Sequence, residues 1–293
     1  MPTGERGMRV DAHQHFWRLA DRAGAWPPAA LAAIHRDFAS SDLAPALRQA
    51  GIDATVLVQS LPSRADTAWL LEVARATPFV RGVVGWVDMK AADAPEAIAA
   101  LAADPLFKGV RPMLQDLPDD DWIADPATGP AADAMADLGL VFDALVLPRQ
   151  LGALFTFARR HPALTVLVDH AAKPDLRGGE LLAWRTALAR LADLPNVHCK
   201  LSGLLTEAAP GADVADLLPA VQAVWSLFGP RRLVWGSDWP VLLLAVDYAH
   251  WCALTEQLLA RVDPPATPAE RAAVLGDNAA SLYRLRPTES SPC

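Results

Sequence analysis

The chain has 293 residues, 52% of them hydrophobic, and a formal net charge of −8. This composition is sufficient for a large core, and the acidic balance without any Lys/Arg-rich run argues against nucleic acid as a partner. No apolar stretch approaches the roughly 20 residues of a membrane-spanning helix, and the first ten residues lack the apolar segment of a signal peptide, which argues against a membrane partner.

The cysteines indicate a reducing compartment. Cys199, Cys252 and Cys293 are scattered along the chain and odd in number, which argues against a disulfide framework. We therefore expect a cytoplasmic protein.

Eight short apolar runs rich in β-branched residues recur along the chain and predict eight buried parallel strands. They span 9–15, 53–59, 80–88, 107–113, 139–146, 164–170, 196–202 and 232–238. Helical stretches rich in Ala and Leu lie between them, at 66–76, 94–102, 149–160, 180–192 and 213–228. This alternation predicts an α/β fold, a single (β/α)8 TIM barrel over residues 1–293. An open doubly wound sheet is the alternative, but no G-x-G-x-x-G motif follows the first strand.

Two connections are unusually long. Residues 16–50 follow the first strand and contain Trp17 and Trp26, and Ser41 or Asp42 could cap a helix within this segment. We expect the segment to form a lid over the barrel mouth. Residues 113–130 form a second long loop after the fourth strand, and residues 286–293 are expected to be a disordered tail.

Polar side chains gather at the carboxyl ends of the predicted strands. His13 and His15 are two residues apart, so both project on one face of the first strand. Other strands end in Gln59, Asp88, Arg111, His170, Lys200, Ser202 and Asp238. Buried polar groups are costly unless they are paired or used, and active sites of TIM barrels lie at this end of the strands. The pattern therefore predicts an active site at the barrel mouth.

The types of these residues suggest a metal-assisted hydrolysis. Three imidazoles and a carboxylate, from His13, His15, His170 and Asp238, suit one divalent metal ion, most readily zinc. Such an ion lowers the pKa of bound water and polarises a carbonyl, and a carboxylate beside it can take the proton of the attacking water.

Several of the same residues also allow a structural interpretation. His170 could be a core histidine bonded to a backbone carbonyl, and Asp238 could cap a turn. Arg111 could form an ion pair with Asp88 or Asp116, and the sequence leaves the direction of Lys200 open. Asp143, in the middle of a predicted strand, is interpreted as a buried structural carboxylate.

Six motifs, in the same order as in a known family, give the chain a resemblance that extends from residue 9 to about 286. They are VDAHQHFW, KGVRPMLQD, VFDALVLPRQL, LVDHAAKPD, NVHCKLSGL and RLVWGSDWPV. They resemble the amidohydrolase superfamily, and within it the branch of sugar-lactone and pyrone-lactone hydrolases. The resemblance implies a TIM barrel that hydrolyses a cyclic ester. It also implies a metal at His13, His15 and His170, an Asp238 carboxylate that activates water, and an Arg111 that contacts substrate.

The chain departs from the two-metal members of this superfamily, which carry a bridging carboxylated lysine on a middle strand. Here Lys108 lies at the start of the fourth predicted strand and Lys200 lies late in the seventh. We therefore expect one metal ion, and a site without metal stays open because some pyrone-lactonase relatives work without one.

The expected substrate is a small-molecule lactone derived from a sugar. Asp238 and His170 are expected to act in catalysis, Asp238 also as a metal ligand. The residues expected to bind substrate are Arg111, Lys200, Gln59, Asp88 and Trp17, the last by stacking on the sugar. The alternatives are a zinc-dependent decarboxylase of a muconate-like acid, a metal-free lactonase of the pyrone-dicarboxylate type, and a non-catalytic barrel that binds a ligand.

Overall fold

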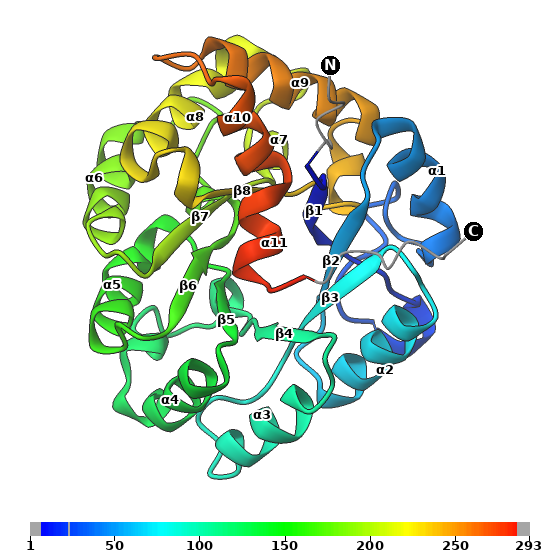
Figure 1. The fold of residues 1–293 in the computed structure, drawn as a ribbon, viewed down its shortest axis with the longest axis vertical. Helices are drawn as coiled ribbons and strands as arrows, with labels where there is room; N and C mark the ends of the chain where they lie inside the picture. Colours follow the sequence, from blue (N-terminus) through cyan, green and yellow to red (C-terminus); the bar gives the residue numbers. More distant parts are fainter. Residues whose placement is uncertain (1–6, 23, 286–293) are drawn as a thin grey trace, which may run out of the picture.

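Eight parallel strands form one sheet in the computed structural model, within the described residues 7–22 and 24–285. The strands are β1 (Val10–Gln14), β2 (Ala54–Val58), β3 (Val80–Gly85), β4 (Phe107–Val110), β5 (Val141–Ala144), β6 (Thr165–Val168), β7 (Val197–Leu201) and β8 (Leu233–Trp235). They follow one another in sequence order around a ring, which Figure 1 shows in projection.

The ring closes beyond the end of β8, where the chain meets β1. The N–H of His15 donates to the Trp239 carbonyl at 2.7 Å, and the N–H of Asp238 donates to the His13 carbonyl at 2.8 Å. The predicted (β/α)8 barrel is confirmed. Its strands end earlier than predicted, because the polar residues at their carboxyl ends already lie in the loops where the chain turns away from the ladder.

Helices surround the strands, apart from the last one, which Figure 1 shows across the centre of the ring. They are α1 (Ser40–Ala50), α2 (Arg64–Arg75), α3 (Ala94–Ala102), α4 (Gly129–Leu138), α5 (Leu151–Arg160), α6 (Leu181–Ala192), α7 (Leu204–Glu207), α8 (Val214–Phe228), α9 (Tyr248–Arg261), α10 (Pro268–Ala272) and α11 (Asn278–Leu282). The five helices predicted from Ala and Leu content are α2, α3, α5, α6 and α8. All five are confirmed.

The core has two layers, because the strands are buried on both faces. The barrel interior is filled by small and β-branched side chains such as Val10, Val56 and Val234. The C-terminal segment closes this interior, since Ala279 and Tyr283 pack against the same cluster. Figure 1 shows α11 lying across the centre of the ring.

The two long loops lie at the mouth of the barrel. In the first, Arg22 is buried and donates to the Trp26 carbonyl at 2.7 Å and to the Ser60 hydroxyl, which ties the loop to the end of β2. The predicted cap of α1 is corrected. The helix begins at Ser40, and Asp42 accepts a hydrogen bond from the Ala39 N–H at 2.8 Å from within the first turn.

The second long loop is built from short 3-10 turns, at Leu114–Asp116, Trp122–Ala124 and Pro126–Thr128. The expected tail at 286–293 lies outside the described residues. Within the ranges that the structure describes, no helix is both long and apolar enough to cross a bilayer.

The contact between Tyr283 and Asp143 gives a test of this architecture. Tyr283 is 1% exposed, and its hydroxyl donates to the Asp143 carboxylate with oxygen distances of 2.8 and 2.9 Å. We expect Tyr283→Phe to lower the free energy of unfolding by about 1–3 kcal/mol, because a buried carboxylate loses a hydrogen bond. Urea unfolding measures this change. A loss below about 0.5 kcal/mol would show that the contact contributes little.

Candidate active site and metal centre

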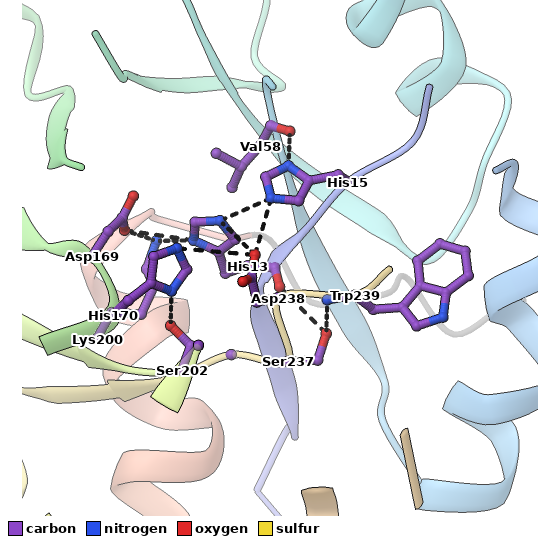
Figure 2. Close-up of polar contacts among 12 residues, drawn as sticks. His13, His15, Val58, Asp169, His170, Lys200, Ser202, Ser237, Asp238 and Trp239 are labelled. Carbon is purple, nitrogen blue, oxygen red and sulfur yellow. Dashed lines mark hydrogen bonds and ion pairs between the residues drawn. The ribbon is translucent and has the colours of Figure 1, made fainter. Parts of the chain in front are cut away.

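His13 and His15 meet above the end of β1. His13 lies within the strand and His15 directly after it, and their Nε2 atoms are 3.2 Å apart. Both side chains are buried. The His15 Nδ1 lies 2.7 Å from the Val58 carbonyl, so this nitrogen carries the proton and leaves the Nε2 lone pair free. Figure 2 shows both imidazoles directed into one space.

His170 enters the same space from the end of β6. Its ring centroid lies 4.5 Å from that of His13, and its Nδ1 lies 2.8 Å from the Ser202 hydroxyl. The backbone of Gly203 packs against this ring. A Cβ at Gly203 would lie 2.6 Å from the His170 Nδ1, and the φ of +63° also favours glycine.

Asp238 faces all three imidazoles (Figure 2). Its Oδ1 lies 3.2 Å from the His15 Nε2, 3.6 Å from the His13 Nε2 and 3.9 Å from the His170 Nε2. The neighbouring Ser237 points away, and its hydroxyl donates to Asp11 at 2.6 Å. Asp11 also accepts from the Ser237 N–H at 2.8 Å, so it anchors the turn that carries Asp238.

These groups fit a single metal ion. Ligand atoms about 2.0–2.1 Å from a tetrahedral zinc are roughly 3.3 Å apart, close to the distances among His13, His15 and Asp238. Ligand atoms also converge in a second, overlapping set of His13, Asp169 and His170. The site therefore has the donors and the spacing that a divalent ion requires.

The charge states of these groups suit a metal site as well. Burial lowers the pKa of His13 and His15 and that of His170 to about 4, so the imidazoles stay neutral near pH 7. Burial alone would raise the pKa of Asp238, but a proton taken up by this cluster goes to an imidazole first, and the resulting positive charge, that of His170 foremost, holds the pKa of Asp238 well below its usual range. Neutral imidazoles and an ionised carboxylate are the forms that bind metal.

Lys200, predicted to bind substrate, lies beneath the histidines rather than on the pocket wall. It is fully buried, and its Nζ lies 2.7 Å from Asp143, 2.8 Å from Asp169 and 3.1 Å from the His13 Nδ1. Burial by itself would lower the pKa of Lys200, but the two carboxylates outweigh it and raise the pKa. The structural interpretation of Asp143 is thereby confirmed.

Arg111 reaches the centre of the site from the end of β4. Its Nη1 lies 3.3 Å from the His13 Nε2 and 3.5 Å from Asp169, so the considered ion pair with Asp88 or Asp116 is replaced by one with Asp169. Gln59 holds Arg111 in place, because its side chain donates to the Arg111 carbonyl and its own carbonyl accepts from Nη2. Gln59, predicted to contact substrate, is fully buried and does not line the pocket.

A cavity of about 360 Å³ opens above the histidines. The predicted residues on its wall are His15, Arg111, His170 and Asp238. The wall also carries polar residues that were not predicted to belong to the site, namely Ser60, Gln115, Asp116, Lys173, Thr206 and Glu207, and apolar residues that include Trp26, Met113 and Leu244.

Two other predicted substrate contacts lie elsewhere. Trp17 is fully buried, packs against Trp26 and Phe38, and donates its indole N–H to the Arg36 carbonyl, so it is a core residue of the first long loop. Asp88 lines a neighbouring, mostly apolar cavity of about 470 Å³, away from the histidines.

Asp169 is the most central residue that sequence analysis missed. It directly precedes His170 at the end of a buried strand, and this position was a usable signal. Lys173 belongs to the same motif, LVDHAAKPD. Glu207 follows a different strand, and nothing in its local sequence marks it.

Comparison with known proteins agrees with this geometry. A family model described as amidohydrolase matches residues 10–285. An L-fucono-1,5-lactonase of Burkholderia ambifaria is 55% identical over 281 residues, which cover 95% of this chain and 96% of that protein. A second L-fucono-1,5-lactonase, from Burkholderia multivorans, is 39% identical with coverage of 95% and 96%.

A solved structure agrees as well. An amidohydrolase from Burkholderia multivorans with bound zinc superposes with a TM-score of 0.86 at 37% identity, and the match covers 95% of this chain and 100% of that one. The closed barrel carries three converging histidines and one carboxylate at its mouth, and the family model spans the whole barrel. This chain therefore belongs to the amidohydrolase family.

Proposed function

We propose that the protein hydrolyses the cyclic ester of a sugar-derived lactone. The observation that carries this proposal is the ionised Asp238 carboxylate, held against neutral histidines on the wall of a pocket that also contains Arg111. The likeness to proteins named L-fucono-1,5-lactonase supports a sugar 1,5-lactone as the substrate.

Asp238 is the base in the proposed reaction. Its carboxylate accepts the proton of the water that attacks the lactone carbonyl, and it returns this proton to the ring oxygen as the C–O bond breaks. Because the pKa of Asp238 is low, the carboxylate is ionised at neutral pH but is a weak base. A cation held at the same site would make that water more acidic and so ease the transfer.

His13, His15, His170 and Asp238 would hold that cation, which we propose to be one zinc ion. When bound, such an ion lowers the pKa of water and polarises a carbonyl. The zinc-bound amidohydrolase of Burkholderia multivorans supports this choice. The residues of this chain then orient the reactants, since Val58 and Ser202 fix the imidazole rings and Gln59 fixes Arg111.

Arg111 is proposed to orient an oxygen of the substrate. Its side chain lines the cavity, so the guanidinium is within reach of a bound substrate. A guanidinium offers donors in a planar fork, which suits a carbonyl or hydroxyl oxygen of the lactone.

A neutral lactone fits the pocket better than a dicarboxylate. The two cationic side chains on the wall, Arg111 and Lys173, are balanced by Asp116, Glu207 and Asp238. A muconate-like acid or a pyrone dicarboxylate would require an excess of positive charge, so the decarboxylase and the pyrone-type lactonase are less favoured.

A panel of lactones tests the proposal directly. A pH-indicator assay with L-fucono-1,5-lactone should show release of acid, because hydrolysis of the ester yields a carboxylic acid. Release of CO₂ from a carboxylated acid would instead indicate a decarboxylase, and the absence of both would leave a binding protein.

The metal centre gives a second prediction. We expect about one divalent ion per purified chain, most of it zinc, and loss of lactonase activity on treatment with dipicolinate that added zinc reverses. Elemental analysis and activity after chelation measure both. Full activity in metal-free protein would contradict the prediction and favour a site that works without metal.

Asp238→Asn preserves the shape of the side chain and removes its basicity. We expect turnover to fall by a factor on the order of 10² or more, while circular dichroism and the melting temperature change little. Asp88→Asn is the matched control, because that carboxylate lies in the neighbouring cavity, and it should keep near wild-type turnover. If Asp238→Asn retains more than about a tenth of wild-type turnover, another residue is the base.

A further inference from the structure

Two charged side chains on the cavity wall, Lys173 and Glu207, have no part in the chemistry assigned above. They come from different loops, after β6 and at the end of α7, and both are half-buried, with 22% and 27% of their side chains exposed. The Lys173 Nζ lies 3.6 Å from the Glu207 Oε1. This distance exceeds an ordinary hydrogen bond, so a small hydroxyl can bridge the two groups.

The backbone that leads from His170 to Lys173 has an unusual conformation. Four successive residues without glycine, His170 to Lys173, have φ between +50° and +58°. This left-handed conformation is unfavourable for residues with a Cβ, and runs of it persist mainly where a functional site requires them. The Lys173 N–H donates to the His170 carbonyl at 2.8 Å, so the segment is a single left-handed turn of the 3-10 type.

A turn of this type has about three residues, so residues three apart lie above one another on the same side. His170 and Lys173 are three apart, and both line the cavity. The strained turn therefore directs the histidine and the lysine into the same space. Within the part of the chain that the structure describes, one turn therefore carries both His170, a proposed metal ligand, and Lys173, a cation on the pocket wall.

Hydrogen bonds hold the two loops together. The Leu176 N–H donates to the Glu207 carbonyl at 3.2 Å, and the Arg177 guanidinium donates to the carbonyls of Thr206 and Ala208 at 3.1 and 3.3 Å. Lys173 and Glu207 are thus positioned by a braced pair of loops before any ligand arrives, which reduces the entropy lost on binding.

We propose that Lys173 and Glu207 form a subsite that binds a hydroxyl group of the substrate and so selects hydroxylated lactones over plain ones. A hydroxyl can accept a hydrogen bond from the Lys173 ammonium and donate one to the Glu207 carboxylate at the same time. An analogue that lacks the hydroxyl leaves only the 3.6 Å ion pair and makes neither hydrogen bond, so the partly buried pair discriminates against it. This inference rests on the proposed lactonase function.

The test compares two substrates in wild-type protein and in Lys173→Met. L-Fucono-1,5-lactone carries ring hydroxyls, whereas δ-valerolactone has the same ring without them. We expect Lys173→Met to lower kcat/KM for the hydroxylated lactone by about 10- to 100-fold, the effect of a lost hydrogen bond to a charged group. For δ-valerolactone the change should stay within about three-fold, because the machinery at Asp238 is intact.

Lys90→Met is the matched control. Lys90 is exposed to a similar extent, 24%, and pairs with Asp125 outside the active-site cavity, so its removal should leave both substrates unchanged. Glu207→Gln should also lower activity selectively on the hydroxylated lactone. An equal loss on both substrates, or no loss on either, would overturn the subsite.

If the proposed lactonase function is wrong, the wild-type protein opens neither lactone, which is a different outcome. The subsite is then decided by isothermal titration with L-fuconate and with 5-hydroxypentanoate, the acids that the two lactones would yield. Tighter binding of L-fuconate that disappears in Lys173→Met supports the subsite, and equal or absent binding of the two acids overturns it.

Discussion

The ammonium group of Lys200 is the interaction on which the rest of the site depends. It lies inside the barrel, fully buried, 2.7 Å from the Asp143 carboxylate, 2.8 Å from the Asp169 carboxylate and 3.1 Å from the His13 Nδ1. A buried charge of this kind is costly unless it is fully paired, and removal of one partner typically destabilises a protein by about 3–5 kcal/mol. The lysine and its partners must therefore fold as a unit.

This unit joins the two ends of the barrel. At the N-terminal end, Tyr283 closes the interior and bonds Asp143; at the other end, Asp169 lies against His13 and Arg111. The charged groups beneath the site thus set the positions of His13, a candidate metal ligand, and of Arg111, a candidate substrate-binding residue. Such support is what keeps a catalytic constellation within the narrow geometry that chemistry requires.

Above this layer, burial sets the charge state of the histidines. It keeps the imidazoles neutral near pH 7, and the Asp238 carboxylate that faces them is ionised. The wall of the cavity then adds charges of both signs, which suits a neutral, hydroxylated ester better than an acid. The loops that carry these charges are anchored by local contacts, such as Asp11 with Ser237 and Arg22 with Ser60, so the pocket is formed before substrate binds.

The sequence alone was sufficient for the barrel and for the end of the barrel at which the candidate site lies. Strand periodicity and strand ends are local properties, so the eight strands could be predicted, and the two-residue spacing of His13 and His15 placed both side chains on one face. The local pattern could not show which polar residue at a strand end faces the cavity. Lys200, Gln59, Trp17 and Asp88 were all assigned to substrate from their positions, yet the first three are fully buried and Asp88 lies in a neighbouring cavity. Only the tertiary structure decided these directions, because they depend on partners far along the chain, such as Asp143 for Lys200 and Arg111 for Gln59. The same holds for Lys173 and Glu207, which come from separate loops and meet only when the barrel closes.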